Sequence, residues 1–532
     1  MREERADVVV IGSGFGGSMA AVPLVGAGLD VLMLERGNWV PPGPGHWSTA
    51  RLRELPPYYP AASTYRTRGV LRAGSARAYY CVGGPSVFFA GVASRFREPD
   101  FEPAEEIVAD SAAEWPYRYR DLEPFYSQAE SLLDVAGRVG EDPTEPPRSR
   151  PYPQDAPELA APSRRLADAA LRLGLQPFRL PLAINYRRQD GRAPCACCPH
   201  CDGFPCHVGA KNDVASAIVP RLLRAGLRLR PCTIALRLLP DGDRVLAVEA
   251  FDRMRGERVR FLAGTFVLAA GALASAHLLL ASGLERRNPG GRIIGRYLMR
   301  HCNAHVFGVF PSRVDPEDRF HKQIGIHDFY FGDDGHGAPQ GKLGSMQQMA
   351  TPKVALALLP APVNRWLAPM VDRLTGLLVI AEDQPRWENR VTIERARLGP
   401  DGLPPLFIEH RYSGRDLAAR RALMRCARSI LFGAGAPIQV PYRIRTFSHA
   451  VGTVRMGSDS AHSALDEWCR FRGLDNLFVT DGSVMPTSAG VNPSLTISAN
   501  ALRTGDYLAR SFASVSRRAG NTGGQPGRRE EP

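Results

Sequence analysis

Long apolar runs are missing from this 532-residue sequence. The most apolar stretch, residues 354–381, contains three prolines and several charged side chains, whereas a membrane-spanning helix needs about 20 consecutive apolar residues. The first residues, MREERAD, also lack the basic and apolar segments of a secretory signal. We therefore expect a cytoplasmic protein without a membrane span.

Lysine is scarce as well. The formal net charge is +13, but only four of the 67 basic residues are lysines, and the arginines are scattered along the chain. Nucleic-acid binding favours a dense basic stripe interleaved with aromatic side chains, and the sequence contains no such stripe. It therefore predicts no nucleic-acid partner.

What is present begins with a glycine-rich turn between a strand and a helix. Residues 8–11 are a β-branched apolar run, as expected of a strand buried in a parallel sheet. Gly12, Gly14 and Gly17 follow with the spacing of a dinucleotide-binding turn. In such a turn one glycine makes the bend, one lets the backbone approach a pyrophosphate, and one packs the helix against the strand.

Glu35 ends the next predicted strand, 23 residues after Gly12. A carboxylate at this position accepts hydrogen bonds from a ribose and repels a 2′-phosphate. A second glycine cluster, residues 81–91, has the small side chains that close approach to a flat or phosphorylated ligand requires, although a buried turn would use the same residues. Residues 261–283 repeat the order of strand, glycine and helix and are expected in the same sheet.

The middle of the chain predicts a second domain. Residues 120–135 and 163–174 have apolar positions at helical spacing, and a proline-rich linker separates them. Between residues 321 and 411, alternating runs predict antiparallel strands, and a long helix is expected from about 415 to 433. Residues 516–532 lack core-forming side chains and are predicted to be disordered.

The C-terminal third carries the most specific motifs. Residues 448–457 (SHAVGTVRMG), 476–488 (NLFVTDGSVMPTS) and 490–497 (GVNPSLTI) together resemble the glucose-methanol-choline (GMC) oxidoreductases. Shorter segments at 115–117 and 294–301 resemble this family too, so the resemblance covers nearly the whole chain. It implies an α/β fold, with a Rossmann-type FAD-binding domain and an α+β substrate domain built on an antiparallel sheet.

The resemblance also implies how the chain divides. The FAD-binding domain is expected to be discontinuous, made of residues 1–100, 208–300 and 440–515. The substrate-binding domain is expected to comprise residues 101–207, which include the cysteine-rich segment 195–206, and residues 301–439.

In this family FAD oxidises an alcohol. Removal of a hydride from a carbinol carbon requires the hydroxyl proton to pass to a nearby base, and an imidazole that titrates near neutral pH suits this task. His449 is the candidate base, and Asn492 can hydrogen-bond the same oxygen and so orient the alcohol. Pro493 stands where a helix is expected to begin, which would direct the positive end of that helix at the flavin.

The resemblance further assigns contacts to FAD. Phe88 and Phe89 stand where several family members carry a histidine bonded to the flavin, so FAD is expected to be held non-covalently. The complete set of residues expected to contact FAD is Gly12, Gly14, Phe15, Gly17, Glu35, Gly83, Gly84, Ser86, Thr233, Asp481, Gly482, Asn492, Pro493 and Thr496.

Five of the ten cysteines lie within residues 195–206 (CACCPHCDGFPC). Without a secretory signal, this density favours a metal or iron–sulfur site over disulfides, although the spacing matches neither paired zinc ligands nor a ferredoxin. Some members of the family have a small iron–sulfur cluster near this position, and others use similar cysteines structurally, so both uses stay open. The candidate ligands for iron–sulfur or zinc are Cys195, Cys198, Cys201 and Cys206.

The sequence thus predicts an FAD-dependent enzyme that oxidises the CH–OH group of an alcohol, either a sugar-like polyol or a secondary-metabolite alcohol. The electron acceptor is left open between oxygen, a quinone and a protein carrier. Two alternatives remain. One is an electron-transfer dehydrogenase with a metal centre at the cysteines, and the other is a lyase of the same fold without net redox chemistry.

Overall fold

The structure is a computed structural model. It describes residues 1–40, 64–69, 75–77, 80–187, 191–198, 201–317, 319, 322–332, 342–349, 368–444, 446–447 and 449–521. Residues 354–367, which are half of the apolar stretch 354–381, and the last 11 residues of the predicted tail lie outside this part of the chain.

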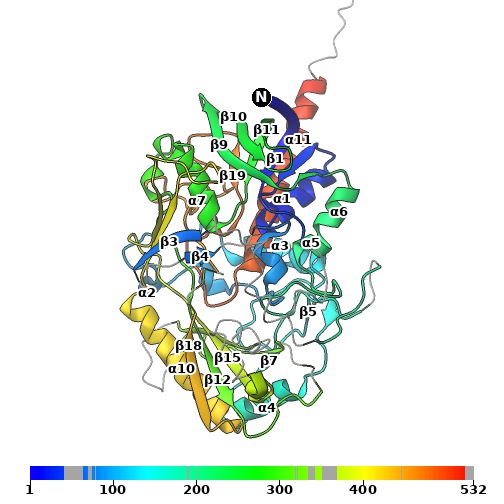
Figure 1. Ribbon diagram of the computed structural model, residues 1–532, viewed down its shortest axis with the longest axis vertical. Coiled ribbons are helices and arrows are strands. Elements are labelled where there is room, and N and C mark those ends of the chain that lie inside the picture. The colour runs from blue at the N-terminus through cyan, green and yellow to red at the C-terminus, as the bar shows by residue number, and fades with distance from the viewer. Residues whose placement is uncertain are drawn as a thin grey trace, which may run out of the picture.

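The glycine-rich turn belongs to a sheet of seven strands (Figure 1). The strand order is β8-β2-β1-β11-β10-β9, with β19 paired to β11. β1 is parallel to β2 and β11, whereas β9 and β10 form an antiparallel extension. The strands are β1 (Arg2–Ile11), β2 (Val31–Leu34), β8 (Arg228–Arg230), β9 (Thr233–Asp241), β10 (Arg244–Asp252), β11 (Glu257–Leu268) and β19 (Leu477–Val479).

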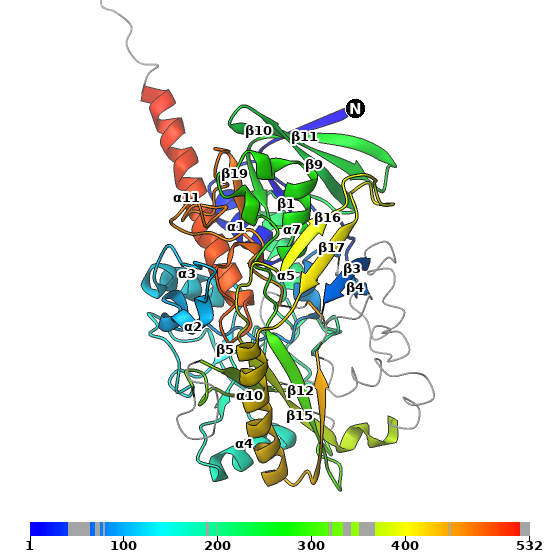
Figure 2. The ribbon, with the colours of Figure 1, turned by 90° about the vertical axis from the view of Figure 1, so that its left-hand side faces the viewer.

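Helices from both ends of the chain pack beside this sheet. α1 (Phe15–Gly26) lies along α11 (Ser494–Asn521), and Figure 2 shows α11 running past the end of the sheet. A Cβ atom at Gly505 would lie 2.4 Å from the carbonyl oxygen of Ala20, so a glycine is needed where the two helices touch. α11 continues to Asn521, which places residues 516–521 of the predicted disordered tail in a helix. The other helices of this part are α3 (Tyr119–Leu132), α5 (Val214–Ala217), α6 (Val219–Arg224) and α7 (Ala272–Ala281).

A second sheet of six antiparallel strands forms the other half of the molecule, with the order β18-β12-β15-β14-β13-β7. α4 (Ala161–Arg172) and α10 (Gly414–Gly433) bury their apolar sides against it in a separate hydrophobic core. The strands are β7 (Phe178–Arg179), β12 (Cys302–Val309), β13 (Ile324–Ile326), β14 (Gly344–Gln348), β15 (Leu374–Ala381) and β18 (Ile438–Arg443).

Two of the strands predicted for the second domain pair elsewhere. β16 (Arg390–Ile393) and β17 (Leu406–His410) form a four-stranded sheet with β3 (Thr64–Gly69) and β4 (Ser75–Arg77). Val391, Leu406 and Ile408 join the core of the first sheet. Conversely, β18 lies in the second sheet although residues from 440 onward were expected in the FAD-binding domain. β16 and β17 lie in the four-stranded sheet because β17 pairs in parallel with the distant β3, and local periodicity does not reveal such a pairing.

The remaining elements are short, and several of them carry site residues. They are β5 (Ala136–Gly137), β6 (Gln154–Asp155), α2 (Glu105–Val108), η4 (Gly84–Phe88), η5 (Glu98–Phe101), η6 (Leu284–Arg286), η7 (Gly291–Ile293), η8 (Ala368–Arg373) and η9 (Gly482–Val484). Across the described residues, every helix is too short or too polar to cross a membrane.

Candidate active site

The three glycines of the first turn have three different surroundings. A Cβ at Gly17 would lie 1.9 Å from the carbonyl oxygen of Gly12, so this residue lets α1 pack on β1. Gly12 has φ +107°, and a Cβ there would lie 2.3 Å from the carbonyl oxygen of Ala269. A Cβ at Gly14, by contrast, would have the Gly83 carbonyl oxygen at 3.9 Å as its nearest neighbour, so this backbone is open to a ligand. This is the division of roles that a dinucleotide turn requires.

Glu35 lies buried at the end of β2, where the sequence placed it. Its carboxylate accepts hydrogen bonds from the Ser13 backbone N–H at 3.1 Å, the Ser13 hydroxyl at 2.6 Å and the Gly37 N–H at 2.8 Å. Burial raises the pKa of Glu35 above its usual value. Thr233 lies beside it, because its N–H donates to the Glu35 carbonyl at 2.8 Å.

The second glycine cluster meets the first. The Gly83 N–H donates to the Ser13 hydroxyl at 2.9 Å, and a Cβ at Gly84 would lie 3.6 Å from the Gly14 Cα. Ser86 supports this turn by donating its hydroxyl to the Gly83 carbonyl at 2.7 Å. Phe15, the first residue of α1, packs edge-on against Phe89 with ring centroids 5.3 Å apart. Residues about 70 positions apart thus form one cradle.

The C-terminal motif closes on the same turn. A Cβ at Gly16 would lie 2.5 Å from the Thr480 carbonyl oxygen, so residues 480–482 run directly against the start of α1. Asp481 accepts from the Gly271 N–H at 2.9 Å and from the Ser483 N–H at 2.8 Å. Burial raises its pKa. The Asp481 carboxylate therefore ties the start of α7 to this segment, which leaves the backbone at Asp481 and Gly482 as the expected ligand contact.

Pro493 precedes the first residue of α11, as expected, and its carbonyl accepts from the Ile497 N–H at 2.9 Å. Thr496, in the first turn, shares a 2.7 Å hydrogen bond with the Tyr126 hydroxyl. The start of α11 is therefore anchored to α3. This anchoring uses the Thr496 side chain, which the sequence had assigned to FAD.

His449 and Asn492 come together although they are 43 positions apart. Nδ2 of Asn492 lies 3.3 Å from Nε2 of His449. On the far side of the amide, Gln347 of β14 donates from Nε2 to Oδ1 of Asn492 at 2.7 Å. This contact fixes the amide with its NH₂ group toward the histidine, so that Nε2 of His449 presents a lone pair.

A second imidazole lies behind the first. Nδ1 of His301, the residue before β12, lies 2.9 Å from Nδ1 of His449. The other ring nitrogen of His301, Nε2, lies 2.9 Å from the Ser488 carbonyl oxygen. Asp383, just after β15, accepts the His301 backbone N–H at 3.0 Å. The second sheet therefore supplies Gln347, His301 and Asp383 to a site whose other residues come from the C-terminal motif.

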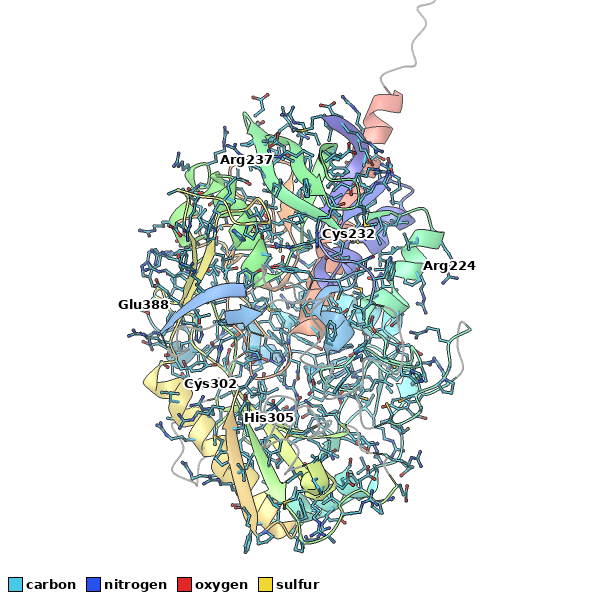
Figure 3. The ribbon with its side chains drawn as sticks, viewed as in Figure 1. Arg224, Cys232, Arg237, Cys302, His305 and Glu388 are labelled. Carbon is cyan, nitrogen blue, oxygen red and sulfur yellow. The ribbon has the colours of Figure 1, made fainter. Side chains whose placement is uncertain are left out.

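The electrostatics of the site keep His449 neutral. Burial lowers the pKa of His449 well below its usual value, and the neighbouring His301 and Lys322 lower it further. Lys322 is itself buried, and burial lowers its pKa too. Burial and Lys322 together lower the pKa of His305, on β12 in Figure 3, to about 3. A neutral imidazole is the form that accepts a proton.

The cysteine segment forms a separate feature. Cys195, Cys198, Cys201 and Cys206 line one apolar cavity of about 20 Å³, which is room for about one water molecule. All ten cysteines, each within the described part of the chain, are free thiols. Among the described side chains, no group of three or more His, Cys, Asp or Glu residues is arranged to hold a metal ion. The predicted ligands thus share a cavity but do not form a coordination sphere.

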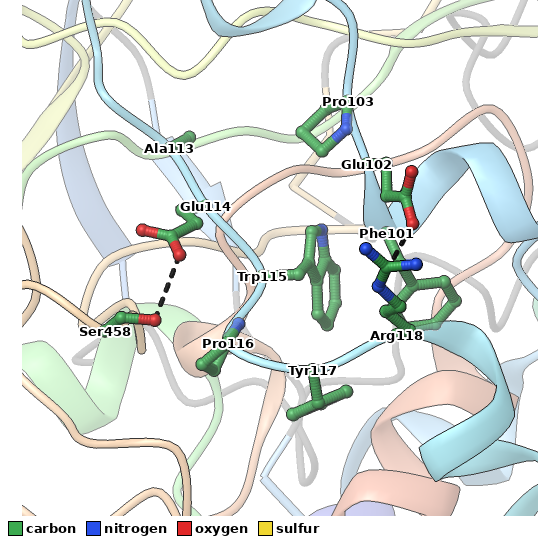
Figure 4. Close-up of a pocket in the computed structure, with 10 residues that line it drawn as sticks. All are labelled: Phe101, Glu102, Pro103, Ala113, Glu114, Trp115, Pro116, Tyr117, Arg118 and Ser458. Atoms are coloured by element: carbon green, nitrogen blue, oxygen red, sulfur yellow. Dashed lines mark hydrogen bonds and ion pairs between the residues drawn. The ribbon is translucent and has the colours of Figure 1, made fainter.

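An open pocket of about 510 Å³ lies on the surface near the residues that resemble the family at 115–117 (Figure 4). Its wall includes Trp115, whose indole N–H donates to the Thr487 hydroxyl at 2.8 Å. Glu114 accepts from the Ser458 hydroxyl at 3.0 Å at one edge. Among its described lining residues, none belongs to the predicted site. We assign to Trp115 a supporting role for the turn that carries Ser488.

These features define a protein with a dinucleotide-binding cradle and a buried histidine beside an asparagine. The family model for GMC oxidoreductases matches residues 117–303 and 385–501, and the chain belongs to that family. It is therefore an FAD-dependent alcohol oxidoreductase, which confirms the resemblance, the α/β fold and the cofactor FAD.

Named relatives support this assignment. The chain is 33% identical to 6'''-hydroxyparomomycin C oxidase of Streptomyces lividus, over 95% of this chain and 92% of the relative. It is also 33% identical to paromamine 6'-oxidase of Streptomyces fradiae, over 96% and 93% of the two chains. The crystal structure of pyridoxine 4-oxidase from "Mesorbium loti" has the same fold, with a TM-score of 0.67 at 22% identity, over 96% of this chain and 99% of that one.

Sequence reasoning missed four residues around the base: His301, Gln347, Lys322 and Asp383. His301 ends a segment that resembles the family, but nothing in that segment indicates a ring contact with His449. Gln347 lies in a plain alternating run. The only sequence signal for Lys322 is the scarcity of lysine, which gives no position.

Proposed function

We propose that the protein oxidises an alcohol with His449 as the base and Asn492 as the group that orients the hydroxyl. The observation that carries the proposal is the 3.3 Å contact between Nδ2 of Asn492 and Nε2 of His449. A hydroxyl oxygen placed beside this pair, within hydrogen-bonding distance of both nitrogens, would donate its proton to Nε2 and accept a hydrogen bond from the amide. Proton acceptance and orientation then act on one oxygen atom.

FAD fits the cradle that the chain provides. Gly14 and Gly84 offer open backbone on adjacent turns, Glu35 offers a buried carboxylate at the expected ribose position, and residues 481–482 lie against the start of α1. When bound, FAD supplies the acceptor for the hydride of the alcohol. The chain's own residues position the alcohol and hold its proton.

A sugar-like polyol or a secondary-metabolite alcohol is the substrate class that we propose. The support comes from the two Streptomyces oxidases, whose names place them on paromomycin-type compounds, and which match nearly the full length of this chain.

The test is anaerobic reduction of the bound flavin by a panel of primary and secondary alcohols, followed by absorbance. His449→Asn should slow reduction by about 10²- to 10⁴-fold, the usual contribution of a positioned base. His462→Asn is the matched control, because His462 is an exposed histidine that pairs with Asp459. If no alcohol in the panel bleaches the flavin of the wild-type protein, the oxidation proposal fails and a lyase becomes the better reading.

The second candidate that we put to the test is an electron-transfer dehydrogenase with an iron–sulfur or zinc centre at the cysteine segment, where the described side chains form no coordination sphere. The favouring observation is the shared cavity of Cys195, Cys198, Cys201 and Cys206. Iron, sulfide and zinc analysis of anaerobically purified protein tests it. A stoichiometric metal that is lost in Cys198→Ser with Cys201→Ser supports the centre, whereas ten titratable thiols without metal would assign the cysteines a structural role.

A further inference from the structure

The pair of imidazoles forms a hydrogen-bonded chain with one direction. Each of the four ring nitrogens of His301 and His449 has a partner: Asn492, the other ring, or the Ser488 carbonyl. A carbonyl only accepts, so Nε2 of His301 carries its proton. Nδ1 of the neutral His301 ring is then a lone pair and accepts from Nδ1 of His449. That leaves the lone pair of His449 on Nε2, facing Asn492.

The surroundings of the two rings differ in charge. His301 lies near the Asp383 carboxylate. Burial raises the pKa of Asp383, but the hydrogen bond from His410 and the charges of His410 and His301 outweigh this effect, so the pKa lies below its usual value. His449 instead faces Lys322 and His301, both of which lower its pKa. The Asp383 carboxylate therefore favours a positive charge on the His301 side of the pair, whereas Lys322 disfavours one on His449.

The backbone holds His301 in an unusual conformation. Its φ is +59°, in the left-handed region that residues other than glycine rarely adopt. Three contacts keep it there: the N–H donates to Asp383 at 3.0 Å, the carbonyl accepts from the Tyr412 hydroxyl at 2.7 Å, and the ring donates to Ser488. The rings of His301 and His449 stand nearly perpendicular, at 87°. Strain held by several contacts is a feature of functional sites.

We propose that His301 receives the proton that the alcohol gives up, acting through His449; this rests on the oxidation proposed above. The O–H bond of the alcohol breaks and an Nε2–H bond forms on His449. The Nδ1–H bond of His449 then breaks and an Nδ1–H bond forms on His301. His449 ends neutral with its proton on Nε2, and His301 ends as the imidazolium next to Asp383. The hydride leaves the same carbon to the flavin, so charge and electrons balance.

The sharpest variant is His301→Asn. Asparagine tolerates the left-handed backbone better than other residues, and its side-chain oxygen can still accept from Nδ1 of His449. It cannot take up a proton. The substitution therefore preserves the orientation of His449 and removes only the second proton acceptor. His462→Asn, an exposed histidine, is the matched control, and the bound flavin spectrum with a melting curve verifies folding.

The measurement is the rate of anaerobic flavin reduction by a saturating alcohol as a function of pH. We expect His301→Asn to lower the rate by about tenfold or more. The acid limb of its pH–rate profile should move, because a proton that the wild-type pair can place on His301 has only His449 as its acceptor in the variant. Groups that face the pair from other elements, Asp383, His410 and Lys322, are unchanged in the variant and its control.

Each outcome decides. A slower rate together with the shifted limb supports the proposal. A slower rate with an unshifted limb means that His301 only positions His449, and a wild-type rate means that it does neither; both results overturn the proposal. Failure of the proposed function would look different, because no alcohol would then reduce the flavin of the wild-type protein.

Discussion

Nε2 of Gln347 donates to Oδ1 of Asn492 at 2.7 Å, which turns the amide of Asn492 so that its NH₂ group faces His449. The donor comes from the second sheet and the acceptor from the C-terminal motif. The two halves of the molecule therefore meet at the residue that is proposed to orient the alcohol.

Replacing Gln347 with leucine should impair this orientation. Without the donor, the Asn492 amide can rotate and turn its oxygen toward His449. Its NH₂ group is then no longer placed to donate a hydrogen bond to the alcohol. We expect flavin reduction to slow by about tenfold, equivalent to about 1.4 kcal/mol of transition-state stabilisation. Stopped-flow absorbance measures the rate. Gln176→Leu, at an exposed position, is the control and should match the wild type; equal rates in both variants would remove Gln347 from the site.

The rate of flavin reduction should stay constant from neutral pH to below 6.5. The neutral imidazole of His449 accepts the proton, and activity is lost only as the pH falls through its pKa, which burial holds well below the usual value. Lys322→Met removes a positive neighbour, so it should raise that pKa and move the acid limb to higher pH. Lys322→Arg keeps the charge and should leave the limb in place. A limb that does not move in Lys322→Met would mean that Lys322 does not influence the base.

Gly17→Ala should abolish FAD binding. The alanine Cβ would lie 1.9 Å from the Gly12 carbonyl oxygen, a backbone atom that cannot move aside without shifting the turn. Such overpacking lowers the free energy of unfolding by about 1–3 kcal/mol or more. We expect a lower melting temperature and a colourless protein. Gly26→Ala is the matched control, because the space around a Cβ at this position in the same helix is open. Flavin retained in Gly17→Ala would contradict the assignment of this turn.

FAD should dissociate completely when the protein is precipitated with acid. Phe88 is buried beside Cys81 and Val87, and Phe89 packs on Phe15, so neither position offers a nucleophile to the flavin. The measurement is the absorbance of the supernatant against that of the pellet. Yellow colour that stays with the pellet would reveal a covalent bond elsewhere in the chain.

Local sequence signals predicted the parts of the fold that depend on neighbouring residues. The long helix expected at about 415–433 is α10 (Gly414–Gly433), which begins at a capping box in which Ser413 and Asp416 exchange hydrogen bonds. The helices expected at 120–135 and 163–174 are α3 and α4. In contrast, the place of β16 and β17 beside β3 depends on a pairing across hundreds of residues.

By itself, the sequence predicted a dinucleotide from the short-range spacing of its glycines. Through the resemblance of its C-terminal motifs to the GMC family, it also predicted FAD and the candidate base. Only the tertiary structure decided what surrounds the base. His301 and His449 are 148 positions apart, and Gln347 and Asn492 are 145 apart. Such contacts depend on how the second sheet packs against the C-terminal motif, and no local pattern in the chain encodes which side chains then come to within 3 Å of one another.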